Sequence, residues 1–236
     1  MPYTLYPEIH DTTISECCLL RGKKVTIISK SIITVIDFET TGPVYHYPDE
    51  PWQIGLVQVV DGKLAPETLY DSLLKVGIRP ANKYVPGRYD ELKEEVAKAP
   101  SLQELWPELQ PRLHKPLAAH SIGTEKKILA KYFPLFEPPL WIDTVKIARV
   151  AFPEWKRHRL EVLIENLGLL PRLKELLPGR TFHDALFDAV ASALFIEFML
   201  QQAKWEKLTP YQLSRIHPHL YFQLLKQEKK QAATGI

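Results

Sequence analysis

The sequence predicts an α/β fold in which helices cover a mixed β-sheet. Between residues 24 and 76, β-branched and apolar segments alternate with glycine and proline turns, which predicts three consecutive strands. After residue 88, helix-like and strand-like segments follow one another. This order indicates one sheet with an antiparallel start, extended and covered by later elements. With 236 residues, 45% of them apolar, the chain can form a sizeable core.

Each element is predicted from its local pattern. The strands are expected at residues 24–39, 52–60, 69–76, 115–120 and the start of 140–152. Asp61 and Gly62 form a good hairpin turn between the second and third strands. Helices are expected at residues 89–99, 101–113, 124–133, the end of 140–152 and about 184–204. Ser101 and Asp143 are plausible N-caps for their helices.

The domain organisation follows from this pattern. We expect an N-terminal extension at residues 1–30, a main domain at residues 31–204 and a C-terminal helical extension at residues 205–236, where apolar and polar residues alternate at helical spacing. The size favours one domain over two.

Composition excludes several classes of protein. Lys and Arg exceed Asp and Glu by only two, so no overall charge indicates a nucleic-acid or lipid partner. The adjacent cysteines, Cys17 and Cys18, suit neither a disulfide framework nor a CxxC metal site, which favours a reducing compartment. No secretory leader pattern is present, and acids interrupt the longest apolar stretch, within residues 184–200. We expect a cytoplasmic protein with no membrane partner.

Two acids end the first strand in "TVIDFETTG". On a strand, residues two apart share a face, so Asp37 and Glu39 present their carboxylates side by side. The preceding "IITVI" is apolar, which puts these like charges at the mouth of a buried strand, where a cation would compensate them. Oxygen ligands suit Mg²⁺ or Mn²⁺. The alternative for an isolated acid pair is a solvated strand edge.

A second group of polar residues opens the long apolar helix. Asp188 lies within its first turns and needs a partner, whereas Asp184 is well placed as the N-cap. His183 falls just before the helix, where its imidazole could act as a general base without being a metal ligand. The alternative is that His183 is an ordinary surface or core histidine.

With these motifs in order, the chain resembles the DnaQ-like, histidine-type DEDD exonucleases of the ribonuclease H-like superfamily. The resemblance rests on "DFETTG" at residues 37–42, "HSIGTE" at 120–125 and "HDALFD" at 183–188, with "WIDTVKIA" between the last two. It covers roughly residues 32–200. It implies a ribonuclease H-like fold, a mixed five-stranded sheet flanked by helices.

The middle motif departs from the family pattern. Glu125 stands where the family has aspartate, and Ser121 stands where it has asparagine. Glu125 is the only acid near that position. Its longer side chain is tolerable for a ligand that acts through water and less so for a direct Mg²⁺ ligand. The alternative is that Glu125 only stabilises the first turn of its helix.

The resemblance implies hydrolysis of phosphodiester bonds at the 3′ end of DNA or RNA, with release of nucleoside monophosphates. Two Mg²⁺ or Mn²⁺ ions, held by the four acids, would activate water and stabilise the leaving oxygen, and the histidine would take the proton of the water. The implied partners are single-stranded or 3′-ended nucleic acids. The implied ligands are Asp37, Glu39, Glu125 and Asp188, the implied base is His183, and the implied nucleic-acid contacts are Thr40, Thr41 and His120.

Other interpretations stay open at this point. The Glu125 change could leave a nuclease-like module that binds nucleic-acid ends with weakened catalysis. His183 and Asp184 could belong to a metal-dependent phosphohydrolase, although further histidine ligands are missing. The basic cluster at residues 155–159 and the lysines after Glu125 could hold a phosphate backbone or be solvated faces. No feature identifies a protein partner.

Overall fold

The structure is a computed structural model. It describes residues 32–77, 79–80, 82–203, 205–206, 208–221 and 223, and all structural statements refer to these residues. The N-terminal extension expected at residues 1–30 lies outside them.

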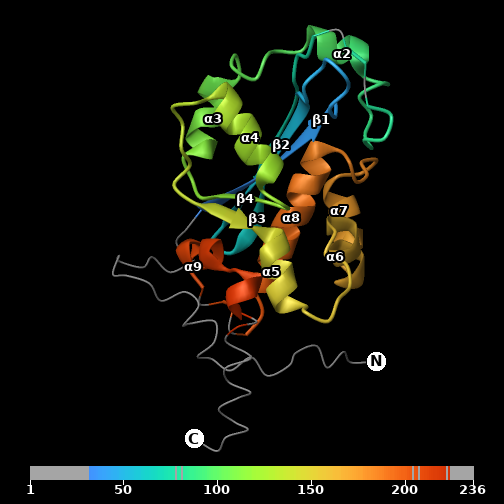
Figure 1. Cartoon of the computed structure of the whole chain (residues 1–236). Coiled ribbons are helices and arrows are strands. Elements are labelled where there is room, and N and C mark those ends of the chain that lie inside the picture. The colour runs from blue at the N-terminus through green and yellow to red at the C-terminus, as the bar shows by residue number, and fades with distance from the viewer. Residues whose placement is uncertain are drawn as a thin grey trace, which may run out of the picture.

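A mixed five-stranded sheet forms the centre of the molecule (Figure 1). The strands are β1 (Ile32–Thr40), β2 (Pro51–Val60), β3 (Lys63–Leu73), β4 (Leu117–Ala119) and β5 (Trp141–Asp143). Their order is β3-β2-β1-β4-β5. The strand β2 is antiparallel to both β1 and β3, β4 is parallel to β1, and β5 is parallel to β4. The predicted turn at Asp61 and Gly62 is confirmed, and both residues have positive φ, as a two-residue hairpin turn requires.

Helices cover both faces of this sheet. The helices are α2 (Lys93–Lys98), α3 (Trp106–Leu113), α4 (Gly123–Tyr132), α5 (Thr144–Ala151), α6 (Leu160–Asn166), α7 (Leu170–Leu176), α8 (Ala185–Leu200) and α9 (Pro210–Arg215). Residues of α3 and α4 pack in one hydrophobic cluster, and residues of α5 to α9 pack in another. None of these helices combines the length and apolar character needed to cross a bilayer.

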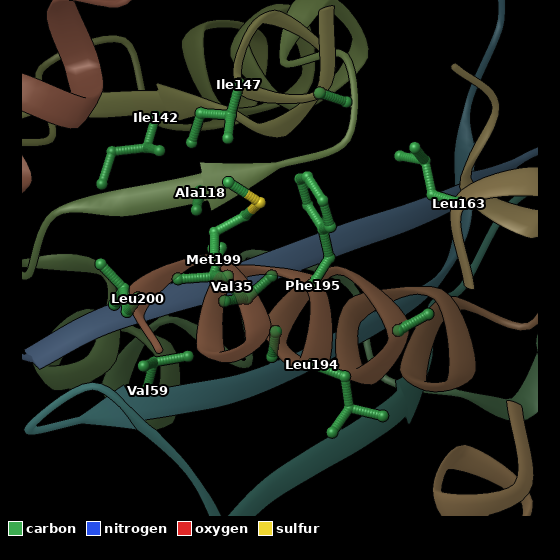
Figure 2. Close-up of a cluster of buried hydrophobic side chains, with 14 of the residues drawn as sticks. Val35, Val59, Ala118, Ile142, Ile147, Leu163, Leu194, Phe195, Met199 and Leu200 are labelled. Atoms are coloured by element: carbon green, nitrogen blue, oxygen red, sulfur yellow. The ribbon is translucent and has the colours of Figure 1, made fainter. Parts of the chain in front are cut away.

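Strand alternation assigns the core residues to the two faces. Val35 of β1 and Val59 of β2 belong to the α8 side, whereas Ile36 and Leu56 belong to the α3 and α4 side. Nearly every side chain of α8 is buried, because α8 lies between the sheet and the outer helices. Figure 2 shows α8 side chains, Phe195 among them, against the strands β1 and β4.

Two predicted helix ends were wrong. Ser101 caps only a local turn, since its hydroxyl accepts from the Glu104 backbone N–H at 3.3 Å. The helix α3 begins later, at Trp106, where Pro107 fills a first-turn position that needs no N–H donor. The helix α8 ends at Leu200, four residues before the expected end. Asp143 does cap α5, accepting from the Val145 N–H at 3.1 Å.

The predicted division into a main domain and a C-terminal extension at residue 205 stays a prediction. Trp205, Leu208 and Leu213 are buried in the same hydrophobic cluster as α8. The described part of residues 205–223 therefore packs on the core, and α9 lies beside β5 at the sheet edge (Figure 1).

Candidate active site

The end of β1 presents Asp37 and Glu39 on the face that α8 covers. Both residues share the strand parity of Val35, which packs in the α8 cluster. Glu39 is only 8% exposed. The apolar residues before the acids explain this placement, because their burial favours a central position of β1 in the sheet.

A glycine in β2 lets α8 approach these acids. Gly55 is the register partner of Asp37. A Cβ atom at Gly55 would clash with the backbone of Ala185 and Leu186 at the start of α8. Only glycine therefore allows the first turn of α8 to lie directly on the strand next to β1.

The start of α8 positions a histidine and an acid. Asp184 caps the helix, as predicted, by accepting from the Phe187 N–H at 3.1 Å. His183 precedes the cap with φ 68°, a left-handed conformation that is unusual for a side chain with a Cβ. Its backbone N–H donates to Asp188 Oδ2 at 3.0 Å, which fixes this carboxylate in the first turn.

A polar clamp holds the start of α8 against β2 and β3. The Arg180 guanidinium binds Asp184 at 2.8 Å and Asp71 of β3 at 2.6 Å. Gln53 of β2 donates to both of these carboxylates, at 3.3 Å and 3.0 Å, and its Oε1 accepts from the Ala185 N–H at 3.2 Å. The clamp fixes the position of the loop that carries His183.

Glu125 lies in the first turn of α4, whereas the other site residues belong to β1 and the start of α8. Its side chain is 4% exposed, and its Oε2 is buried without a hydrogen-bond partner among the described residues. Asp188 Oδ1 is likewise buried and unpartnered within the described chain. Buried carboxylate oxygens without donors are costly, so two of them facing one site need an external partner.

Ligand atoms of Glu39, His183 and Asp188 lie within 4.8 Å of one another. Burial raises the pKa of Asp37, and the charges of Asp188, Glu125 and Glu39 raise this pKa further. The structure thus brings together Glu39, His183 and Asp188, and the assignment of all five residues to metal binding and catalysis stays a prediction.

The acids are difficult to ionise together. Burial raises the pKa of Glu39 to about 8, with a further increase from the Asp188 charge. Burial likewise raises the pKa of Glu125 to about 7 and that of Asp188 to about 7. For Asp37, burial is again the largest cause and raises the pKa well above 3.8. A bound divalent cation would remove this cost, and the unpartnered oxygens of Glu125 and Asp188 fit such an ion.

Two of the three residues predicted to contact nucleic acid make hydrogen bonds within the protein. Thr41 is 1% exposed, and its N–H donates to the Glu50 carbonyl at 2.9 Å, so it braces the loop after β1. Both ring nitrogens of His120 are engaged at 2.8 Å, one with the Thr144 hydroxyl and one with the His158 carbonyl. Thr40 stays partly exposed. Contacts of these residues with nucleic acid remain predictions.

The basic segments have structural partners. Trp155, in the 155–159 cluster, stacks on Phe152 with ring centroids 4.3 Å apart. Lys131 forms an ion pair with Glu50 at 2.7 Å, and Lys126 lies 5.7 Å from the centroid of the Trp141 ring. Trp155 is therefore partly buried and packs against the core.

Sequence reasoning missed several residues that build the site. Gln53, Gly55 and Arg180 hold α8 in place, and Glu161 of α6 lies 3.7 Å from His183 Nε2. A glycine and a glutamine inside the apolar run "WQIGLVQVV" are unusual for a buried strand and were the available signals. The contact of Arg180 with Asp71 and that of Glu161 with His183 gave no local signal, since both join distant segments, whereas Arg180 and Asp184 are only four positions apart.

An exonuclease family model, RNase T, matches residues 34–195. A DNA polymerase III subunit epsilon-like protein of Rhodobacter capsulatus is 30% identical over 197 residues, covering 79% of this chain and 26% of the relative. A 3′-5′ exonuclease DinG of Staphylococcus haemolyticus is 28% identical over 181 residues, covering 74% of this chain and 18% of the relative. The chain thus spans about a quarter or less of these relatives' length.

Solved structures show the same fold. Exonuclease X in complex with 5′ overhanging duplex DNA has a TM-score of 0.55 at 22% identity, covering 76% of this chain and 99% of that chain. The nuclease domain of 3′hExo, a DEDDh family member bound to rAMP, has a TM-score of 0.57 at 18% identity, covering 74% and 94%. These neighbours confirm the expected ribonuclease H-like sheet flanked by helices.

The fold is that of an exonuclease domain, and the match to an exonuclease family model confirms the family resemblance read from the sequence. The chain belongs to the RNase T exonuclease family. Divalent-metal dependence is a property of this class, and the donor set described above fits it.

Proposed function

We propose that the protein is a 3′-to-5′ exonuclease that hydrolyses the terminal phosphodiester bond of DNA or RNA and releases nucleoside monophosphates. The observation that carries the proposal is the group of Glu39, His183 and Asp188, whose ligand atoms lie within 4.8 Å of one another. Asp188 in this group and Glu125 on α4 each have a buried carboxylate oxygen without a hydrogen-bond partner among the described residues. Such a site is costly without a cation and a substrate to bind. The names of the sequence relatives support the same activity.

The proposed ligands are Asp37, Glu39, Glu125 and Asp188, and two Mg²⁺ or Mn²⁺ ions fit their all-oxygen character. Bound ions would balance the acid charges and polarise the scissile phosphate.

His183 takes the proton of the attacking water, as a general base on a loop fixed by its backbone bond to Asp188. The unusual φ of His183 and the Arg180 clamp hold the imidazole in position. Glu161, 3.7 Å from Nε2, is placed to orient the ring. Burial of Glu39 and Glu125 excludes water from the inner side of the site. A cytoplasmic setting stays part of the proposal.

The experiment compares single-stranded DNA and RNA, labelled at the 3′ or the 5′ end, with Mg²⁺, Mn²⁺ or EDTA. Early release of a labelled mononucleotide from the 3′-labelled strand, and stepwise shortening of the 5′-labelled strand, is the expected result. Asp188→Asn should abolish it, and Asp61→Asn, at the far end of the sheet, is the matched control. Binding of 3′ ends without hydrolysis under either ion would refute the proposal.

A further inference from the structure

Two loops beside the active site expose aromatic rings to solvent. Tyr45 is 84% exposed and Tyr84 is 83% exposed, which is unusual for side chains of this size. We use the term tyrosine surface for Tyr45, His46, Tyr47, Lys83 and Tyr84. The proposed exonuclease chemistry uses none of these residues.

The first loop is held in a fixed shape. Val44 and Tyr47 exchange two backbone hydrogen bonds, at 3.1 Å and 2.7 Å, which closes a tight turn with Tyr45 and His46 at its tip. His46 has φ 67°, as such a turn requires, and its ring centroid lies 3.8 Å from that of Tyr45. The Arg79 guanidinium lies 5.6 Å from the centroid of the Tyr47 ring. Tyr45 is therefore presented to solvent by an ordered turn.

The second loop is bonded to the first. The Asn82 N–H donates to the Thr41 carbonyl at 3.0 Å, and Asn82 Nδ2 donates to the Pro43 carbonyl at 2.9 Å. Asn82 Oδ1 in turn accepts from the Tyr84 N–H at 3.0 Å. One asparagine thus fixes the start of the Tyr45 loop and the backbone of Tyr84 together.

The same loops border the catalytic acids. Thr41 follows Glu39 by two residues, and a Cβ atom at Gly87 would lie 3.5 Å from Glu39 Oε2 and 3.8 Å from the His183 carbonyl. The two loops that carry the tyrosine surface therefore lie next to Glu39 and His183, where the proposed cleavage of a 3′ end takes place.

The chemistry of the surface fits unpaired nucleotides. Exposed ring faces stack on any base, and stacking contributes strongly to the binding of single strands. Lys83 Nζ lies 5.1 Å from the centroid of the Tyr84 ring, and Lys83 forms no ion pair within the described residues. A free ammonium beside an exposed ring suits a nucleotide, whose phosphate follows its base.

We propose that the tyrosine surface binds unpaired nucleotides next to the terminal one, with Tyr45 and Tyr84 stacking on bases and Lys83 contacting a phosphate. This inference rests on the proposed exonuclease function and deepens it. Bases in a blunt duplex are already stacked on their neighbours, so the surface favours 3′ ends that are single-stranded.

The test uses the full chain and two substrates. One is a single-stranded oligonucleotide, and the other is the p-nitrophenyl ester of thymidine 5′-monophosphate, which has no neighbouring bases and reports on the catalytic centre by itself. The double variant Tyr45→Ala/Tyr84→Ala should raise KM for the oligonucleotide about 5-fold to 100-fold per ring lost. The oligonucleotide-to-ester ratio of KM values should rise accordingly.

Matched variants separate stacking from other effects. Tyr45→Phe/Tyr84→Phe keeps the rings and should retain most of the affinity, and Tyr211→Ala removes an exposed tyrosine from α9, on the other side of the fold. Equal losses on both substrates, or an unchanged oligonucleotide KM in the alanine double variant, would overturn the proposal. So would a Phe variant as weak as the Ala variant.

A binding measurement keeps this test independent of hydrolysis. Fluorescence anisotropy with a labelled oligonucleotide, in an Asp188→Asn background, should show the same loss of affinity in the alanine double variant. If the wild type hydrolyses neither substrate, the exonuclease proposal fails, and the anisotropy result still decides on the tyrosine surface. Unchanged binding in that measurement would overturn the proposal.

Discussion

Raising the pH of the metal-free protein from 5 to 8 should lower its free energy of unfolding. The reason is that Glu39, Glu125 and Asp188 have raised pKa values in the folded protein, so they stay protonated there while the unfolded chain ionises. Stability from such groups is fully present below their unfolded pKa and is lost as the pH rises through the folded pKa. The window runs from about 4.5 to about 8 for Glu39.

The size of the effect can be worked out for Glu39, which is 8% exposed. Its pKa rises from 4.5 to about 8 because of burial and the neighbouring Asp188 charge. Each pH unit between the unfolded and folded pKa costs about 1.4 kcal/mol. Between pH 4.5 and pH 7 this residue alone should therefore cost on the order of 3 kcal/mol of stability, a large part of the usual 5–15 kcal/mol.

Urea unfolding in EDTA at several pH values measures this slope. The Glu39→Gln variant is neutral in both states and should lose much of the pH dependence, whereas Glu67→Gln, at an exposed position in β3, should behave as the wild type. Mg²⁺ or Mn²⁺ should restore stability at pH 8. If Glu39→Gln unfolds with the same pH slope as the wild type, the view of a crowded, uncompensated acid cluster is wrong.

Three further changes probe the catalytic elements. His183→Ala should lower turnover by about 10²-fold to 10⁴-fold with little change in metal affinity by calorimetry, because the histidine is a base on a loop; lost metal binding would contradict that role. For Glu125, the wild type should prefer Mn²⁺, Glu125→Asp should shift the preference toward Mg²⁺, and Glu125→Gln should fail with both; an active Gln variant would mean that three carboxylates suffice. Gly55→Ala should destabilise the protein by about 1–3 kcal/mol in thermal or urea unfolding, since its methyl group meets the α8 backbone, and an unchanged stability would contradict that close approach.

The sequence was informative where local pattern decides structure. The apolar, β-branched run before Asp37 identified β1, and Asp37 and Glu39 lie at the end of this strand, as expected. The Asp61 and Gly62 turn and the Asp184 cap need only short-range chemistry, and both are confirmed. The family resemblance predicts that Glu125 and the α8 residues share one site, and this assignment stays a prediction.

The remaining features depend on contacts between distant segments. Arg180 binds Asp71 across 109 positions of sequence, and no local pattern predicts that pairing. The hydrogen bonds of both His120 ring nitrogens could not be predicted from the sequence either, since one partner is a backbone carbonyl 38 positions away. The start of α3 could have been placed by Pro107, but the periodicity of the segment outweighed it.

The position of α8 makes the active site one of the last parts of the chain to be completed. Asp37 and Glu39 leave the ribosome early, but His183 and Asp188 follow about 150 residues later, and synthesis adds roughly 5–20 residues per second. During that interval β1 and β2 lack the helix that covers them. A nascent or truncated chain that ends before His183 therefore carries three of the four proposed acid ligands but neither Asp188 nor the proposed base, and the proposed site stays incomplete until the domain is nearly finished.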